Sequence, residues 1–392
     1  MTRSKNKIIR SVTVSQSLGF CREVMIKMRA KGYDMVAVTS PGPELDELRN
    51  KDGFHCVEVP MERHISVVND LKSLIRMIDV FRKEKPQVVH SMTPKAGLLC
   101  MLAAWITRVP RRVHTFTGLV WPTATGLSRK ILMATDWLTC ACATHIIPEG
   151  KGVMKDLQHI SHKPMKVLGF GNVRGVDMDY WRKTNASSNK LREIKRDDVF
   201  TFIFVGRIVR DKGINELIAA FDKLSQEHKV RLLLVGTFED ALDPVDVSTK
   251  KIIEGNSSIE YLGPQYGTDL LACYAASDCL VFPSYREGFP NTVLEAGAME
   301  LPSIVTDING SREIIVCRNE ENTSPIRDMK LCDNGIIIPP RNEDFLYKAM
   351  EEVFKNDNVR AMMASQAREM VATRFEQSFV QKCLLDFYEE II

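Results

Sequence analysis

The clearest indication of the fold class is the stretch Phe200-Thr-Phe-Ile-Phe-Val-Gly-Arg-Ile-Val-Arg-Asp-Lys-Gly213. Its first six residues are a β-prone run, and Gly206 follows where a strand would turn. After Gly213, apolar residues recur at helical spacing, which predicts a helix over residues 214–225. A strand, a loop and an amphipathic helix in this order are the repeating element of a parallel α/β sheet.

The same alternation extends along the chain on both sides of this stretch. Further strands are predicted at residues 8–14, 34–39, 87–91, 112–116, 144–147, 165–168, 231–235 and 279–282. Helices are predicted at residues 270–276, from Asn291, and at 67–82, where Leu71, Leu74, Ile75, Ile78 and Phe81 should face the sheet.

This pattern fails between Gly169 and Asp198, as expected of a linker. We therefore predict an α/β chain of two doubly wound, Rossmann-like domains facing a central cleft. The predicted parts are a first domain at 1–170, a linker at 171–198, a second domain at 199–375 and a C-terminal helix at 376–392 that could return to the first domain. Residues 316–333 are interpreted as a surface insertion. Open parallel sheets bind ligands at the carboxyl ends of their strands, so functional residues are expected there.

Composition excludes several classes. The 392 residues carry a net charge of +3, too balanced to indicate nucleic-acid binding. The ten cysteines lack zinc or Cys-x-x-Cys spacing, which favours reduced thiols in a reducing cytosol. The sequence starts without the pattern of an export signal. Its longest apolar run, residues 98–106, is far shorter than the roughly 20 residues of a membrane span.

Two predicted loops in the second half of the chain contain candidate functional residues. Arg207 and Lys212 lie beside the start of a predicted helix, where two cations and a helix dipole would suit a diphosphate. Glu287 and Glu295 flank the start of another helix, where carboxylates can accept hydrogen bonds from sugar or ribose hydroxyls. Taken singly, each pair could equally be solvated loop or capping charges.

Together these segments resemble the retaining glycosyltransferases of family four, which have the two-domain GT-B architecture. The resemblance rests on Gly-Arg-x4-Lys-Gly at 206–213, Glu-x7-Glu at 287–295, Pro283-Ser-Tyr-Arg-Glu-Gly-Phe-Pro-Asn291 and Thr306-Asp-Ile-Asn-Gly-Ser-Arg-Glu313. It implies that Arg207 and Lys212 hold a donor diphosphate, that Glu295 holds the ribose, and that Glu287 contacts the transferred sugar. It further implies donor contacts from Gly19, Gly206, Tyr261, Gly288, Phe289, Pro290, Asn291 and Thr292.

The first domain resembles the acceptor domain of the subgroup that builds bacterial capsular and surface polysaccharides on polyprenyl diphosphate. This resemblance rests on the motifs His90-Ser-Met-Thr-Pro-Lys-Ala-Gly97 and Val113-His-Thr-Phe-Thr-Gly118. Many members of the family have a histidine where this chain has Thr117. Acceptor-side candidates are His90, Lys95, His114 and Thr117. His90 is the better candidate for the cleft, while His114 is more typical of a core residue. A single glycine, Gly19, remains in the first loop.

Between Lys85 and Thr135 the sequence has seven cations and no acid, interleaved with Trp105, Trp121 and several aliphatic residues. This composition suits peripheral contact with an anionic membrane or a lipid diphosphate. The alternative is two ordinary helices with buried apolar faces and solvated arginines.

We therefore expect a retaining, metal-independent hexosyltransferase. It would move a hexose or N-acetylhexosamine from a UDP-sugar to a polyprenyl-diphosphate-linked saccharide, without a cofactor, in the cytoplasm or at the inner face of the cytoplasmic membrane. No metal site and no nucleic-acid partner are expected. The alternatives are a UDP-N-acetylhexosamine epimerase, which would alter UDP-sugar without an acceptor, and a non-catalytic nucleotide-sugar binding protein.

Overall fold

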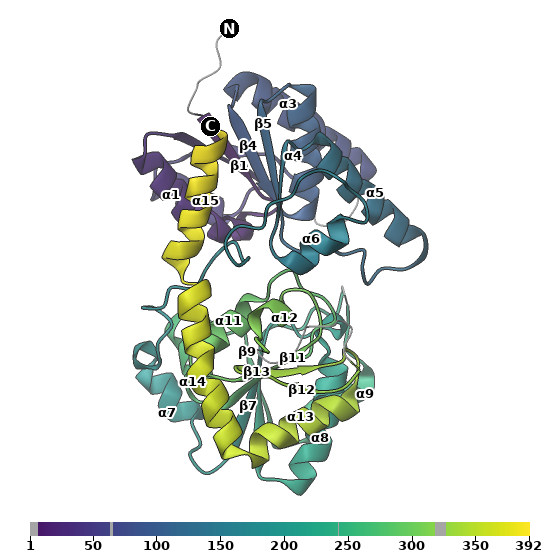
Figure 1. Cartoon of the computed structure of the whole chain (residues 1–392), viewed down its shortest axis with the longest axis vertical. Coiled ribbons are helices and arrows are strands. Elements are labelled where there is room, and N and C mark those ends of the chain that lie inside the picture. The colour runs from purple at the N-terminus through teal and green to yellow at the C-terminus, as the bar shows by residue number, and fades with distance from the viewer. Residues whose placement is uncertain (1–6, 63–65, 242, 318–326) are drawn as a thin grey trace. The chain divides into compact units, whose positions relative to one another are not determined.

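The computed structural model describes residues 7–62, 66–241, 243–317 and 327–392. The chain divides into two compact units. Unit 1 comprises Met1–Gly175 and Ser378–Ile392, and unit 2 comprises Val176–Gln377. Each unit is built on one sheet, and helices cover both faces of each sheet (Figure 1).

Unit 1 has a six-stranded parallel sheet in the order β3-β2-β1-β4-β5-β6. The strands are β1 (Lys7–Ser11), β2 (Asp34–Thr39), β3 (His55–Glu58), β4 (Val88–Met92), β5 (Arg111–Phe116) and β6 (His145–Pro148). The helices are a 3-10 turn η1 (Ser15–Phe20), α1 (Arg22–Ala30), α2 (Pro43–Asn50), α3 (Val67–Glu84), α4 (Pro94–Ile106), α5 (Gly126–Cys142), α6 (Lys151–Leu157) and α15 (Gln377–Ile391).

Alternate residues of these strands pack into two separate hydrophobic cores, one on each face of the sheet, because successive side chains of a strand point to opposite faces. Ile8 of β1 packs in a cluster with residues of α1, α2 and α15, while its neighbour Ile9 packs in a cluster with residues of α3 to α6. The sheet is therefore covered on both faces, as parallel sheets usually are. The last helix of the chain, α15, belongs to this unit through Leu384, Phe387 and Tyr388.

Unit 2 has a seven-stranded sheet in the order β12-β13-β11-β10-β7-β8-β9, parallel except for the edge strand β12. Its strands are β7 (Phe200–Val205), β8 (Val230–Val235), β9 (Ile259–Gly263), β10 (Cys279–Phe282), β11 (Ser303–Thr306), β12 (Lys330–Leu331) and β13 (Gly335–Ile338). Its helical elements are η2 (Lys183–Asn185), α7 (Ser188–Ile194), η3 (Arg210–Lys212), α8 (Ile214–Glu227), α9 (Val247–Gly255), α10 (Gly267–Ala275), α11 (Asn291–Ala298), α12 (Ser311–Ile314), α13 (Glu343–Lys355) and α14 (Asp357–Arg374).

The strands predicted at 34–39, 200–205 and 279–282 are confirmed to the residue. Residues 176–198 of the predicted linker belong to unit 2 and include the helix α7. The edge strand β3 was not predicted. Two predictions are wrong. Residues 165–168 contribute a single bridge, from Met165 to Ile146 of the edge strand β6, rather than a strand. On α3, Leu71 and Ile75 do not face the sheet; they are 57% and 52% exposed.

The cysteine prediction also needs a correction. Cys317 and Cys332 form a disulfide, and the other eight cysteines are free. This disulfide closes the segment predicted to be a surface insertion, of which residues 318–326 lie outside the described part of the chain.

Candidate functional site

In unit 2 the order of the strands reverses between β7 and β10. These strands are neighbours in the sheet although η3, α8, β8, α9, β9 and α10 separate them in the chain. The loops that leave these two strands therefore start side by side at the same edge. Such a reversal creates the crevice where open α/β sheets bind ligands. The two motifs singled out in the sequence, residues 206–213 and 283–295, follow β7 and β10.

Two glycines let these loops pack backbone against backbone. Gly213 has φ +70°, and a Cβ there would lie 2.1 Å from the Pro283 carbonyl oxygen. Gly310 has φ +74°, and a Cβ there would lie 2.4 Å from the Gly288 carbonyl oxygen. A side chain at either position would be strained and would push the loops apart. The loop after β11, which carries Gly310, thereby joins the other two.

Lys212 lies inside this cluster. Its ammonium group contacts the Glu287 carboxylate, which also accepts a hydrogen bond from Ser284 Oγ at 2.8 Å. The Lys212 and Glu287 side chains are only 13% and 16% exposed. The backbone N–H of Tyr285 donates to the Asp211 carbonyl oxygen at 2.8 Å, which ties the two loops beside the ion pair. The structure thus brings Lys212 and Glu287 together in a largely desolvated place.

Arg207 is held by a residue that sequence reasoning missed. Its Nη1 donates to Glu239 Oε2 at 2.8 Å, and Glu239 lies in the loop after β8. Burial alone would lower the pKa of Arg207, but the hydrogen bond and charge of Glu239 raise it. The remaining guanidinium nitrogens extend the donor set of the site. The only sequence signal for Glu239 was its place after a predicted strand, next to β7 in the sheet.

Tyr261 stands on β9 beside that same loop. Its hydroxyl donates to the Gly236 carbonyl oxygen at 3.1 Å, and its ring meets Phe238 edge to face, with centroids 5.2 Å apart. Gly236 packs directly against Gly206, since a Cβ on Gly236 would lie 1.7 Å from the Gly206 carbonyl oxygen. The half-exposed Tyr261 ring is therefore linked to the start of the Arg207 loop through two glycines.

The other predicted donor residues surround the start of α11. Gly288, Phe289 and Pro290 are buried, and the Phe289 ring packs on Phe375 at 5.2 Å, so the side chain belongs to the core. Asn291 and Thr292 are partly exposed in the first turn, where a helix carries partial positive charge. Glu295 is buried one turn further, and Tyr274 Oη donates to its Oε2 at 3.4 Å.

In unit 1 the strand order reverses between β1 and β4, and a pocket lies at this point. Its volume is about 530 Å³, within the range of small-molecule sites. Its lining residues are Thr13, Val14, Ser17, Asp70, Thr93, Pro94, Lys95, Leu98, Leu99, Val120, Ile131, Leu132 and Thr135. Of the predicted acceptor-side residues, Lys95 lines the pocket and forms an ion pair with Asp70 at 2.6 Å.

Three other predicted residues of unit 1 lie differently. Thr117 follows β5 and is partly exposed, but it does not line the pocket. Gly19 is exposed, and a Cβ there would meet no protein atom within 4 Å, so no neighbour requires a glycine. His114 is 1% exposed, packs on Gly97 and shares a hydrogen bond with Ser91 Oγ at 2.8 Å. Burial lowers the pKa of His114 to about 3, so it is a neutral core residue.

The interpretation of His90 as a cleft residue is wrong for this structure, because the ring is buried and both of its nitrogens have partners. Nδ1 contacts Arg10 Nη1 and, at 2.7 Å, Tyr388 Oη, while Nε2 meets Thr115 Oγ1 at 2.7 Å. Burial, followed by the charge of Arg10, lowers the pKa of His90 well below its usual range. Arg10 also donates to Tyr388 Oη at 2.9 Å, so this network fastens α15 to the sheet.

The cations between Lys85 and Thr135 do not share one surface. Arg111 and Arg112, at the start of β5, donate to the carbonyl oxygens of Ile391 and Cys142 at 2.5 and 2.6 Å. Arg129 and Lys130 lie instead on the exposed first half of α5, at the opposite edge of the sheet. Of the aromatic residues in this stretch, Trp121 is buried and Trp105 is 57% exposed.

Other features lie apart from these residues. Among the described side chains, Glu227, His228 and Glu351 could together hold a metal ion, but they gather at the carboxyl end of α8. Lys212 precedes the amino end of that helix, about 21 Å away for 14 residues. None of the helices within the described ranges has the length and apolar content needed to cross a membrane.

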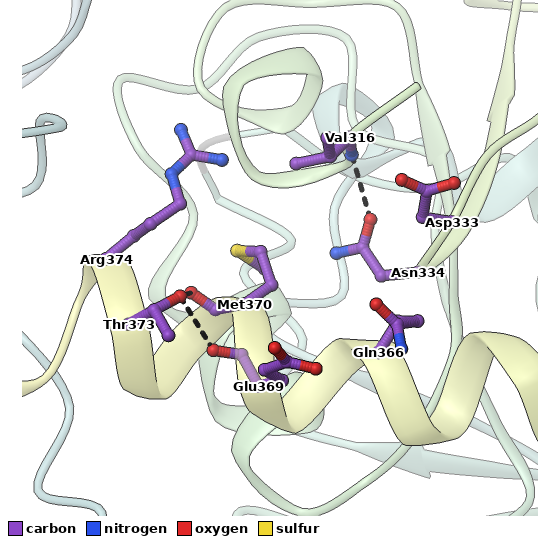
Figure 2. Close-up of a pocket in the computed structure, with 8 residues that line it drawn as sticks. All are labelled: Val316, Asp333, Asn334, Gln366, Glu369, Met370, Thr373 and Arg374. Atoms are coloured by element: carbon purple, nitrogen blue, oxygen red, sulfur yellow. Dashed lines mark hydrogen bonds between the residues drawn. The ribbon is translucent and has the colours of Figure 1, made fainter. Parts of the chain in front are cut away.

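A cavity of about 140 Å³ lies in unit 2, and its lining includes Val316 and Asp333, the chain neighbours of the two disulfide cysteines (Figure 2). Gln366, Glu369, Thr373 and Arg374 of α14 line one side, and Asn334 on the other side accepts a hydrogen bond from the Val316 N–H at 2.8 Å. No residue predicted from the sequence lines this cavity.

Comparison with known proteins identifies the family. Residues 20–159 match the family described as "Glycosyl transferase 4-like domain", and residues 187–370 match "Glycosyl transferases group 1". The chain is 32% identical over 397 residues to the capsular polysaccharide biosynthesis glycosyltransferase CapM of Staphylococcus aureus, covering 98% of this chain and 97% of that protein.

A second relative is the UDP-Gal:alpha-D-GlcNAc-diphosphoundecaprenol alpha-1,3-galactosyltransferase of Escherichia coli. It is 28% identical over 352 residues, which cover 85% of this chain and 83% of that protein. Among solved structures, Anabaena HepE in complex with UDP-glucose superposes with a TM-score of 0.75 at 15% identity, covering 98% of this chain and 99% of that one. The likeness in fold extends over both Rossmann-like units of this chain. Together with CapM, which matches nearly the whole sequence, it shows that this chain belongs to the GT-B glycosyltransferases.

Proposed function

We propose that this glycosyltransferase moves a hexose or N-acetylhexosamine from a UDP-sugar to a saccharide carried on polyprenyl diphosphate, in the synthesis of a capsular or surface polysaccharide. The donor class and the acceptor class are those of the Escherichia coli relative, a UDP-Gal:alpha-D-GlcNAc-diphosphoundecaprenol galactosyltransferase. The capsule assignment follows the Staphylococcus aureus relative. The observation that carries the proposal is the gathering of Lys212, Glu287 and the start of α11 at the strand-order reversal of unit 2.

In this proposal the cations of unit 2 bind the leaving group. As the bond between sugar and phosphate breaks, negative charge grows on the diphosphate, and preorganised positive groups stabilise that charge most effectively. Arg207, Lys212 and the amino end of α11 supply them. Glu295 accepts the ribose hydroxyls, and the Tyr261 ring lies beside the base.

Glu287 contacts the transferred sugar in this proposal rather than attacking it. Its carboxylate is already occupied by Lys212 and Ser284, unlike a free nucleophile. We propose that the acceptor hydroxyl attacks the face from which the diphosphate departs, and that a leaving phosphate oxygen accepts the hydroxyl proton. The anomeric configuration is then retained. Because Arg207 and Lys212 can neutralise the leaving diphosphate, we also propose that transfer requires no metal ion.

We assign the acceptor to unit 1, where the pocket and Lys95 lie at the carboxyl edge of the sheet. Contact with an anionic membrane is proposed through α5 alone, because Arg129 and Lys130 are exposed there whereas Arg111 and Arg112 bind backbone carbonyls. Each cation near such a surface contributes about 1 kcal/mol.

The test is to incubate the full chain with a panel of UDP-sugars and polyprenyl-diphosphate saccharides, and to read product mass and anomeric configuration. Growth of the acceptor by one sugar with retained configuration is the expected result. Conversion of a UDP-sugar without acceptor would establish the epimerase instead. Tight UDP-sugar binding without any product would favour a binding protein, and an inverted product would overturn the mechanism.

A further inference from the structure

The segment between β8 and α9, which we call the β8 loop, continues the pairing of β7 with β8 beyond the ends of both strands. Its described residues are 236–241 and 243–246. The Ile208 N–H donates to the Thr237 carbonyl oxygen at 2.9 Å, and Ile208 pairs with Phe238 in a parallel bridge. Because Arg207 and Glu239 each adjoin a residue of this bridge, both side chains start from backbone that the sheet holds in place.

Glu239 occupies one part of the Arg207 guanidinium and leaves the rest for a ligand. Arg207 Nη1 donates to Glu239 Oε2 at 2.8 Å, whereas a guanidinium has five N–H groups in one plane. The Glu239 side chain is the more buried partner of this pair, at 24% exposed against 47% for Arg207. An arginine loses rotamer entropy when a ligand fixes it, and a partner that fixes it beforehand lowers that cost of binding.

The β8 loop also holds the backbone that carries Lys212. Asp243 Oδ2 accepts a hydrogen bond from the Asp211 N–H at 2.7 Å, and the Asp243 carbonyl oxygen accepts one from the Arg210 N–H at 3.2 Å. Both donors belong to η3, whose last residue is Lys212. The Asp243 N–H in turn donates to the Glu239 carbonyl oxygen at 3.2 Å. The contacts that this loop makes to the two cation-bearing positions are therefore joined to each other.

The next acid in the β8 loop has a different partner. Asp240 Oδ2 accepts a hydrogen bond from Lys250 Nζ of α9 at 2.8 Å, and the Asp240 side chain is 54% exposed. Exposed ion pairs of this kind contribute little to stability. Two adjacent acids of one loop thus differ in what they hold, and only Glu239 of this pair binds a cation of the candidate site.

We propose that Glu239 is a positioning residue for sugar transfer, which holds the Arg207 guanidinium in the orientation that binds the departing diphosphate. The inference rests on the proposed function, which gives Arg207 this ligand, and it adds a residue that acts through Arg207. Glu239 keeps its hydrogen bond to Arg207 while the donor is bound, as a supporting side chain does. The alternative is a carboxylate that competes with the diphosphate for Arg207 and has to release it before the donor binds.

Two substitutions of Glu239 separate orientation from charge. Glu239→Ala removes the acceptor oxygen, so kcat should fall by about threefold to tenfold, and UDP should bind about threefold more weakly or worse in calorimetric titration of the full chain. Glu239→Gln keeps an oxygen that can accept from Arg207, and its kcat should stay within about twofold of the parent. Asp240→Ala is the matched control, since it removes the neighbouring acid. Its kcat and its UDP affinity should both equal those of the parent.

The double variant Arg207→Met/Glu239→Ala tests whether Glu239 acts through Arg207. A residue that acts only through Arg207 has no effect once Arg207 is replaced, so kcat of the double variant should equal that of Arg207→Met. A further fall in the double variant would show that Glu239 supports the loop itself, and would overturn the inference. So would equally low rates in Glu239→Gln and Glu239→Ala. Tighter binding of UDP by Glu239→Ala would identify the carboxylate as a competitor of the diphosphate and would overturn it as well.

The same proteins distinguish failure of this inference from failure of the proposed function. Unchanged kcat and UDP affinity in Glu239→Ala, with slower transfer by Arg207→Met, would refute the inference and leave the proposed function intact. Absence of transfer by the parent, with weaker UDP binding in Glu239→Ala that disappears in the Arg207→Met background, would refute the proposed function and leave the positioning role of Glu239.

Discussion

Replacing Lys212 by methionine removes a positive charge but keeps most of the side-chain volume. Because the Lys212 side chain is only 13% exposed, solvent screens its charge weakly. Loss of one preorganised group at a developing anion typically lowers kcat by about 10²–10³, or about 2.7–4 kcal/mol. We expect a loss in that range, with a smaller loss of about tenfold for Arg207→Met, because Arg207 is 47% exposed.

A second effect should appear in binding. Without its lysine, the Glu287 carboxylate would repel the incoming diphosphate, so the affinity for UDP should also fall. In the double variant Lys212→Met/Glu287→Gln this repulsion is gone, and UDP affinity should partly recover although transfer does not. A double variant that binds UDP no better than the single one would show that the repulsion is unimportant.

Initial rates with UDP-sugar and a lipid-linked acceptor measure the first effect, and calorimetric titration with UDP measures the second. Lys229→Met is the matched control, since Lys229 forms an exposed ion pair with Asp198 at 2.5 Å just before β8, at the opposite end of that strand from the Glu239 loop. Its rate should stay within twofold of the parent. A Lys212→Met enzyme that keeps kcat within threefold would refute the electrostatic role of this residue.

Three further predictions concern stability and metal dependence. Tyr388→Phe deprives the buried Arg10 of a hydrogen bond, so the free energy of unfolding in urea should fall by about 1.5–3 kcal/mol. The control Tyr347→Phe removes an exposed hydroxyl and should leave the free energy of unfolding nearly unchanged. Equal effects of the two substitutions would contradict the stabilising role of the Arg10–Tyr388 hydrogen bond. Burial raises the pKa of Asp136 to about 7, above its usual 3.8, so the fold favours the neutral acid. The contribution of Asp136 to the free energy of unfolding should be full below about pH 4 and lost as pH rises towards 7. Urea titrations at pH 5 and 8 should show this pH-dependent loss of stability in the parent and not in Asp136→Asn. The same pH dependence in both proteins would contradict the raised pKa. Transfer should continue at the same rate in excess EDTA, and a rate restored only by added Mg²⁺ would contradict metal independence.

Most of the fold could be predicted because it depends on local patterns. The strands over residues 200–205 and 279–282 are apolar runs bounded by turn residues, and a helix starts at Asn291 as expected. The period of α3 was also read correctly, but not the exposure of Leu71 and Ile75. Periodicity shows that apolar residues share a face, and it does not show whether protein or ligand covers that face.

The errors at the site arise from contacts between distant residues. His90 follows the pattern of a strand end open to substrate, yet it is buried by Arg10 and Tyr388, which lie 80 and 298 residues away. The partnership of Glu239 with Arg207 depends on β8 lying next to β7 in the sheet. The basic stretch was divided because β5 and α5 run in opposite directions, so cations near in sequence reach opposite edges of the sheet.

An experimental structure of the chain with bound UDP would show directly which residues hold the nucleotide. We expect diphosphate oxygens within hydrogen-bond distance of the Arg207 guanidinium and the Lys212 ammonium, with the ribose hydroxyls at Glu295. A nucleotide bound elsewhere, or bound with its diphosphate turned away from both cations, would contradict it.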